Sequence, residues 1–147
     1  MTDHAPCDPV ADYLHHTPFA KFLGLQARMD ERGLVLVLPF APVLIGNPIL
    51  PALHGGVLSA LLETVARLRA FDPVSMDHLP KTIDLNIDYL HSGKPRDSFA
   101  RARALKIGRR TATIVAEAWQ ENEAEPIAFL RAQFLLSRPE SALESGS

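Results

Sequence analysis

A histidine and two glycines precede a mostly apolar stretch of the chain that contains one carboxylate. His54, Gly55 and Gly56 are followed by residues 57–69, which include neither glycine nor proline and therefore predict a long helix. The first turn of a helix carries unpaired backbone N–H groups and the positive end of the helix dipole. Glycines leave these donors uncovered by side chains. Because such donors stabilise a developing oxyanion, the stretch is suited to acyl-transfer chemistry.

The carboxylate, Glu63, lies about two helical turns beyond the glycines, where an acid is rarely buried without a partner or a function. Ser59, Glu63 and Arg67 form one polar stripe on this otherwise apolar helix. An acid four residues before an arginine is the favoured orientation for a simple helical ion pair. An ionised carboxylate is also the form that attacks a carbonyl carbon or takes a proton from water. The spacing alone therefore leaves a structural ion pair and a catalytic acid both open.

The rest of the chain predicts the elements that must position these residues. One or two short helical turns and a β-hairpin precede a proline-containing loop, and four strands follow the long helix. The predicted segments are helical turns at 10–16 and 18–23, strands at 25–30 and 33–40, a loop at 41–53, and strands at 82–90, 99–107, 111–120 and 127–137. One long helix among six strands predicts the α+β class, with a strongly curved antiparallel sheet wrapped around a single central helix. We expect one domain at 10–138, an N-terminal tail at 1–9 and a disordered C-terminal tail at 139–147.

The strand after the long helix has the most regular pattern in the chain. Apolar and polar residues alternate from Thr82 to Leu90. This alternation predicts a half-buried strand with two distinct faces. One face would hold Ile83, Leu85, Ile87 and Tyr89, and the other Thr82, Asp84, Asn86 and Asp88.

Composition excludes several functional classes. The chain has 147 residues, 47% of them hydrophobic, and a net charge of −2, which gives no whole-molecule field for nucleic acid or an anionic membrane. No stretch has the length of a membrane span and the first residues do not resemble a signal peptide, so we expect a cytoplasmic protein. The single cysteine, Cys7, fits a reducing compartment. The six histidines lack the spacing of a metal site, and we expect no metal.

The segment Gly46-Asn47-Pro48, the His54-Gly55-Gly56 motif with Glu63 nine positions after the histidine, and the strand from Lys81 to Leu90 together resemble the hotdog-fold acyl-CoA thioesterases. The resemblance is to the branch named for the phenylacetate-pathway thioesterase, and it extends from about Pro18 to Leu136. It implies hydrolysis of an acyl-CoA thioester to a free acid and coenzyme A, without a cofactor.

The resemblance also implies a role for individual residues. Glu63 would be the catalytic nucleophile or general base, and Gly55, with Gly56, would offer N–H groups to the thioester carbonyl oxygen. His54 would begin the helix and orient the loop. Asn47 would position substrate or water, although it lies one residue further from His54 than in the family pattern, and Thr82 would hold the attacking water.

The spacing places Arg67 beside Glu63, so we expect Arg67 in the substrate site, where it would hold Glu63 ionised. The resemblance implies that Lys106, Arg109 and Arg110 around the Gly108 turn would meet the phosphates of coenzyme A; ordinary solvated turn residues are the alternative. A homodimer or a dimer of dimers is expected, with Glu63 of one subunit facing Asn47 or His54 of the other. The alternative functions are a hotdog-fold enoyl-CoA hydratase or dehydratase and a non-catalytic acyl-CoA-binding module.

Overall fold

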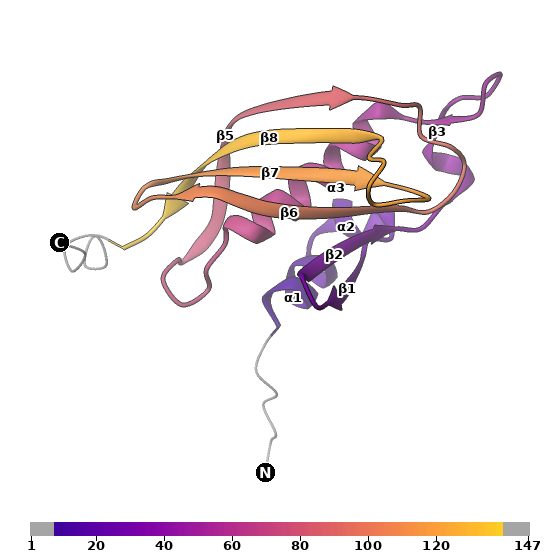
Figure 1. Ribbon diagram of the computed structural model, residues 1–147. Coiled ribbons are helices and arrows are strands. Elements are labelled where there is room, and N and C mark those ends of the chain that lie inside the picture. The colour runs from indigo at the N-terminus through magenta and orange to yellow at the C-terminus, as the bar shows by residue number, and fades with distance from the viewer. Residues whose placement is uncertain (1–7, 140–147) are drawn as a thin grey trace, which may run out of the picture.

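The computed structural model describes residues 8–139, with one long helix, α3 (Gly55–Ala70), packed against a curved antiparallel sheet (Figure 1). The helix is longer than the predicted 57–69 by two residues at its start and one at its end. The sheet order is β1-β2-β6-β7-β8-β5, so β1 and β5 are its two edges. Its strands are β1 (Gln26–Asp30), β2 (Gly33–Leu38), β5 (His78–Tyr89), β6 (Ser98–Ile107), β7 (Thr111–Trp119) and β8 (Ala128–Ser137).

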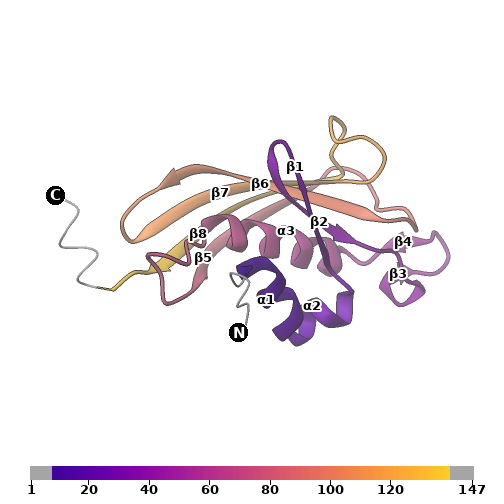
Figure 2. The same ribbon diagram turned by 90° about the horizontal axis from the view of Figure 1, so that it is seen from below.

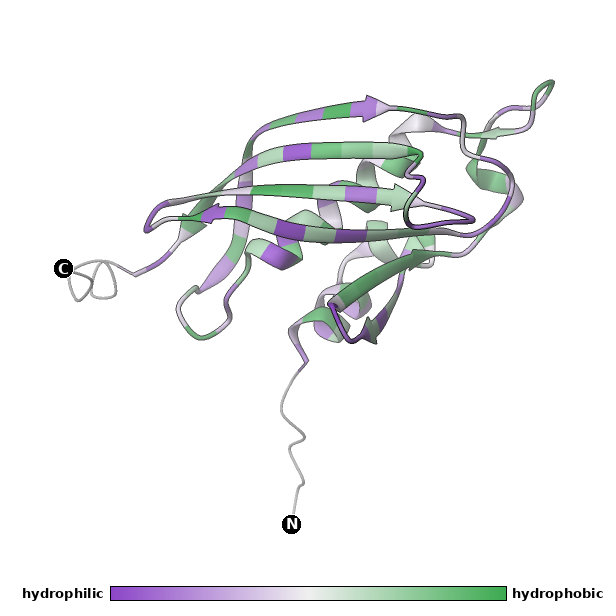
Figure 3. Cartoon of the chain, viewed as in Figure 1, coloured by the Kyte–Doolittle hydropathy of each residue, from purple (hydrophilic) through white to green (hydrophobic). Residues whose placement is uncertain are grey.

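The core lies between α3 and the face of the sheet that the helix covers. On α3, Leu58, Leu61 and Leu62 are almost completely buried. From the sheet, Leu130 and Phe134 of β8 are fully buried. Buried and more exposed residues alternate along β8, and in Figure 3 polar bands interrupt the apolar colour near the middle of this strand. The predicted sheet wrapped around one helix therefore has the expected two-faced strands.

Smaller elements cover the other side of α3 and its N-terminal end. Helices α1 (Pro9–His16) and α2 (Pro18–Leu23) lie on the side of α3 opposite the sheet (Figure 2). The predicted loop at 41–53 contains the short 3-10 helix η1 (Pro42–Leu44) and a two-stranded hairpin, β3 (Ile45–Asn47) with β4 (Ala52–Leu53), which leads directly into α3.

The predicted faces of the strand after α3 are wrong at its beginning. Thr82 pairs with Phe134 and Asp84 pairs with Gln133, so the register shifts between them and Ile83 is the extra residue of a β-bulge. Phe134 faces the helix, and Thr82 opposite it does the same, whereas Ile83 is 54% exposed. The strand also begins at His78 instead of Thr82. The bulge thus turns a threonine that strict alternation assigns to the outer face toward α3.

The other predicted elements are present, and each end lies at the predicted residue or at most two residues from it. Helix α1 begins at Pro9, capped by Asp8, inside the predicted N-terminal tail. Residues 1–7, with Cys7, and residues 140–147 lie outside the described part of the chain. Within residues 8–139, no helix has both the length and the apolar character needed to cross a membrane.

Candidate active site

The start of α3 leaves one backbone donor unused. His54 is the N-cap, and its Nδ1 accepts a hydrogen bond from the N–H of Gly56 at 2.9 Å. The Val57 N–H bonds to the His54 carbonyl oxygen at 2.9 Å. The N–H of Gly55 has no acceptor among the described residues. The structure therefore divides the roles predicted for the two glycines: Gly56 is occupied by the cap, and Gly55 is the donor available to a ligand.

The 3-10 helix η1 and strand β3 fix His54 in place. The His54 N–H bonds to the Leu44 carbonyl oxygen at 2.9 Å. A Cβ atom at Gly46 would lie 2.9 Å from the backbone Cα of His54, which is closer than real Cβ contacts allow. Glycine at position 46 is therefore required for the close approach between β3 and the helix cap.

Tyr89, at the end of β5, contacts the start of α3, although the sequence predicted it only as a strand residue. Its hydroxyl donates a hydrogen bond of 2.9 Å to the Gly55 carbonyl oxygen. Gly55, Leu58, Tyr89 and residues 90–93 line a hollow of about 340 Å³ beside the helix start. An aromatic residue at the end of the strand was the only available signal, because the contact joins residues 34 positions apart.

Glu63, Arg67 and Thr82 form a hydrogen-bonded group that we call the helix cluster. Oε1 of Glu63 accepts from Nη2 of Arg67 at 2.8 Å and from the Thr82 hydroxyl at 2.8 Å. Nη2 of Arg67 also donates to the Thr82 hydroxyl oxygen at 3.0 Å. The bulge at Ile83 makes this possible, because it turns Thr82 toward the helix. The structure thus brings together three of the predicted site residues.

The two carboxylate oxygens of Glu63 are not equivalent in this arrangement. Oε1 has two donors, whereas Oε2 accepts no hydrogen bond from a described residue. The Glu63 side chain is 29% exposed, so it remains accessible. A carboxylate that is fixed through one oxygen and open at the other can act as a base or as a nucleophile.

Asn47 lies apart from the helix cluster. Its side-chain oxygen accepts from the N–H groups of Ile49 and Leu50, at 3.1 and 3.4 Å, and so forms the turn between β3 and β4. Ile49 and Leu50 at this turn are 88% and 73% exposed. Within the described chain, no hydrogen bond joins Asn47 to Glu63, Arg67 or Thr82.

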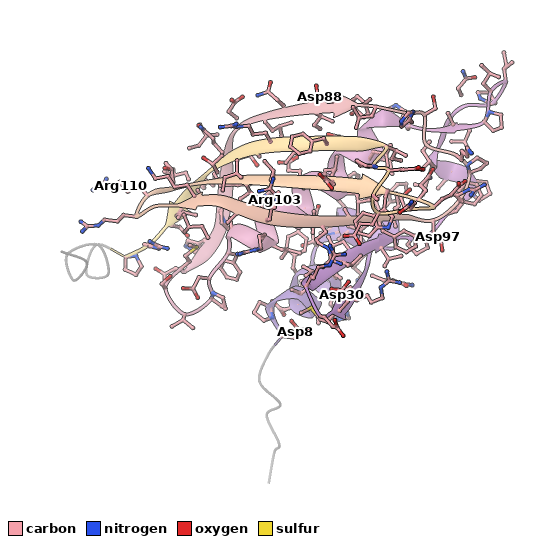
Figure 4. The ribbon with its side chains drawn as sticks, viewed as in Figure 1. Asp8, Asp30, Asp88, Asp97, Arg103 and Arg110 are labelled. Atoms are coloured by element: carbon pink, nitrogen blue, oxygen red, sulfur yellow. The ribbon has the colours of Figure 1, made fainter. Side chains whose placement is uncertain are left out.

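Of the basic residues predicted to bind phosphate, Lys106 lies near the end of β6, and Arg109 and Arg110 lie in the turn that leads to β7. Arg110 projects from this turn away from the sheet (Figure 4). Lys106, Arg109 and Arg110 form no ion pair with any described residue. A further arginine, Arg138, donates to the Gly108 carbonyl oxygen at 3.0 Å, so this turn carries more positive charge than the sequence suggested. Lys94 and Arg96 at the preceding turn both pair with Glu121 instead.

No group of three or more potential metal-ligating side chains is found among residues 8–139.

The chain is similar in sequence and fold to proteins of the thioesterase superfamily. The model of the thioesterase superfamily matches residues 50–127, which include α3 and strands β5 to β7. A medium/long-chain acyl-CoA thioesterase, YigI, of Salmonella typhimurium is 29% identical over 76% of this chain and 81% of its own. A protein of Chromobacterium violaceum has a crystal structure with 34% identity, coverage of 87% and 89% of the two chains, and a TM-score of 0.69.

The fold comparison extends to more distant structures. A phenylacetic acid degradation-related protein of Ralstonia eutropha shares 20% identity, with coverage of 87% and 99% and a TM-score of 0.71. These matches confirm the predicted hotdog fold.

Proposed function

We propose, from the premise that the chain belongs to the thioesterase superfamily, that it is an acyl-CoA thioesterase that hydrolyses an acyl-CoA to a free carboxylic acid and coenzyme A. The observation that carries the proposal is the Glu63 carboxylate, held through Oε1 with Oε2 open, on a helix whose first N–H is unused. The similarity to medium/long-chain acyl-CoA thioesterases makes fatty acyl-CoAs the first substrates to test.

The chemistry requires one donor and one carboxylate. The Gly55 N–H polarises the thioester carbonyl and stabilises the oxyanion that forms on its oxygen. Glu63 takes a proton from water, whose oxygen attacks the carbonyl carbon; alternatively, Glu63 attacks that carbon and water hydrolyses the resulting anhydride. The C–S bond breaks, and the coenzyme A thiolate leaves and receives a proton.

Two copies of the chain supply one site in this proposal. Gly55 and Glu63 are eight residues apart on α3, which corresponds to about 12 Å of helix rise. A carbonyl oxygen must lie about 3 Å from its donor, and the carbon about 3–3.5 Å from the attacking atom. One thioester does not span the separation within a single chain. We therefore pair Gly55 of one subunit with Glu63 of the other.

The sheet offers an edge for this pairing. Strand β5 has 12 residues and is an edge strand with unpaired backbone groups along one side. A homodimer, or a dimer of such dimers, satisfies them and brings the two β5 strands together.

The function is tested by release of free thiol from a panel of acyl-CoAs that differ in chain length. A thioesterase releases thiol, a hydratase changes only the absorbance of an enoyl-CoA, and a binding module does neither. Light scattering that shows only a 16.1 kDa species would contradict the dimer.

A hybrid dimer tests the shared site. Gly55→Pro removes the N–H at the first helical position, where proline is well tolerated, and His54 already has the extended conformation that precedes proline. When Gly55→Pro and Glu63→Gln chains are co-expressed with different tags, each hybrid has one intact site and one doubly defective site. We expect about half of wild-type activity, whereas a site within one chain would give none.

We also propose that the basic turn at Lys106, Arg109 and Arg110 binds the phosphates of coenzyme A. Thr82 pairs with Phe134, and Phe134 pairs with Ala112, so the turn begins two strands, or roughly 10 Å, from the helix cluster. Arg109→Ala and Arg110→Ala should raise KM with little change in kcat, because remote phosphate contacts are as strong in the ground state as in the transition state. An N-acetylcysteamine thioester, which lacks phosphates, should be hydrolysed equally well by wild type and variants.

A further inference from the structure

We propose that Arg67 is a positioning residue for this hydrolysis, and the proposal rests on the function proposed above. Arg67 holds Glu63 and Thr82 with one nitrogen, Nη2, at 2.8 Å from Oε1 and 3.0 Å from the threonine hydroxyl oxygen. It thereby determines which carboxylate oxygen reacts and which way the hydroxyl points.

An ordinary helical ion pair does not account for this arrangement. Exposed acid–base pairs four residues apart on a helix contribute little to stability. Here the side chains of Arg67 and Glu63 are 25% and 29% exposed, and the third partner comes from β5, 15 residues further along the chain. The Nε of Arg67 is buried without a hydrogen-bond partner among the described residues, which is a cost that a freely placed surface arginine would avoid. The contacts with Glu63 and Thr82 therefore hold the Arg67 guanidinium in place although its Nε–H has no acceptor in the described part of the chain.

The first consequence concerns the carboxylate. Rotating the Glu63 side chain would break two hydrogen bonds to Oε1 at once. Oε1 is thus the anchoring oxygen, and Oε2, which no described donor reaches, is the oxygen that meets water or the thioester carbon.

The second consequence concerns the hydroxyl. A hydroxyl has one proton to donate and two lone pairs. The proton of Thr82 goes to Glu63 Oε1, and one lone pair accepts from Arg67. Only the second lone pair remains, so Thr82 can accept a hydrogen bond from a water molecule but cannot donate one to it. Its predicted role in holding water is thereby narrowed to that of an acceptor.

The test compares Arg67→Met, Arg67→Lys and the matched control Arg69→Met, which lies on the same helix with an exposed side chain and no described ion pair. A misplaced catalytic group costs roughly 10-fold to 100-fold in rate. We expect Arg67→Met to lower kcat by such a factor with KM within about twofold of the wild-type value, because Arg67 acts on Glu63 and not on the substrate. Arg67→Lys should recover part of kcat. Arg69→Met should match wild type.

Chemical rescue distinguishes a positioning arginine from one that only stabilises the fold. Methylguanidinium in solution should raise kcat of Arg67→Ala, and should leave Arg69→Ala and Glu63→Gln unchanged. Absence of rescue together with loss of activity in proportion to loss of folded protein would overturn the proposal, as would an Arg67→Met enzyme with the kcat of Arg69→Met.

A crystal structure of Arg67→Met separates this proposal from the proposed function. We expect the Glu63 carboxylate to leave Thr82 or to change rotamer. If the contact between Glu63 and Thr82 is unchanged, Arg67 does not position them, whether or not the wild-type protein releases thiol from acyl-CoA. If the contact is lost but wild type is inactive on every thioester, the proposed function fails and the positioning geometry stands.

Discussion

Two groups of hydrogen-bonded arginines and carboxylates in this molecule differ in whether a carboxylate oxygen is left without a partner among the described residues. The first is the helix cluster. The second, which we call the hairpin network, contains Asp30, Arg32, Arg101 and Glu123, and Asp30 lies at the tip of the β1–β2 hairpin (Figure 4). In the helix cluster only one of two carboxylate oxygens is occupied. In the hairpin network all four are occupied.

All four carboxylate oxygens of the hairpin network are occupied, largely because all three guanidinium nitrogens of Arg101 donate hydrogen bonds. Nη1 donates to Oδ1 of Asp30 at 2.9 Å, Nη2 donates to Oδ2, and Nε donates to Oε1 of Glu123 at 2.9 Å. Arg32 occupies the remaining oxygen of Glu123. The hydrogen bonds from Arg101 hold the pKa of Asp30 well below its usual range, and Asp30 in turn raises the pKa of Arg101. A carboxylate with no free oxygen stabilises structure, whereas one with an open oxygen can react.

The comparison predicts its largest effect at Glu63. Glu63→Gln removes the open carboxylate oxygen and should lower turnover by roughly 10²-fold or more, in the range that loss of a general base produces. Glu123→Gln, the matched change in the hairpin network, should leave turnover within about twofold of wild type. Steady-state kinetics on the best acyl-CoA measure both. Wild-type turnover in Glu63→Gln would show that the helix cluster is structural too.

A smaller effect is expected at Thr82, because it supports the carboxylate without replacing it. Thr82→Val removes the hydroxyl at nearly constant volume and should lower kcat by about 10-fold, while Thr82→Ser keeps the hydroxyl and should retain most activity. If valine and serine variants are equally active, the hydrogen bond to Oε1 is not part of catalysis.

The sequence predicted the helix cluster only in part. Glu63 and Arg67 are one helical turn apart, so the periodicity of α3 is sufficient to pair them. The side of the strand on which Thr82 lies was predicted wrongly, because strict alternation cannot anticipate a bulge at Ile83. Within the described chain, the Gly55 N–H is free because the His54 ring accepts a hydrogen bond from Gly56 and not from Gly55. The orientation of this ring does not follow from the spacing of residues in the sequence.

The hairpin network shows a different limit. The order of helices and strands follows from local patterns, and the six-stranded sheet around one helix was predicted correctly. Arg101 and Asp30, however, are 71 positions apart, and Arg101 and Glu123 are 22 apart. Their contacts depend on the position of the β1–β2 hairpin relative to β6. Packing across the whole sheet determines this position, and a single sequence does not reveal it.

We expect a change in the hairpin network to lower the stability of the fold without changing the rate of hydrolysis. Arg101→Met leaves two carboxylates without their shared partner, and the Arg101 side chain is only 14% exposed. We expect the melting temperature to fall by roughly 2–4 °C, which corresponds to about 1 kcal/mol for a chain of this size. The kcat of the folded protein should be unchanged. Arg69→Met is the control, and a melting temperature equal to that control would show that the network contributes nothing measurable.

The smallest expected effect is the pH dependence of the contribution from Asp30. Its pKa is lowered from the ordinary value of 3.8 by Arg101, so at higher pH the paired, ionised form stabilises the folded state in full. As the pH falls below 3.8, the unfolded chain takes up a proton that the folded chain still excludes, and this contribution is lost progressively until the folded carboxyl is protonated too. Asp30→Asn lacks the charge but keeps the oxygen that accepts from the Arg32 N–H at 2.9 Å, so it isolates the ion pair.

The difference in melting temperature between wild type and Asp30→Asn should therefore be constant near neutral pH and shrink below pH 3.8. Because this site faces solvent, added salt should reduce the difference as well. Asp84→Asn, at an exposed position on the outer face of β5, is the control and should show no such trend. A difference between wild type and Asp30→Asn that stays the same from neutral to acidic pH would mean that the hairpin network holds the hairpin by geometry and not by charge, and the contrast with the helix cluster would then rest on Glu63 alone.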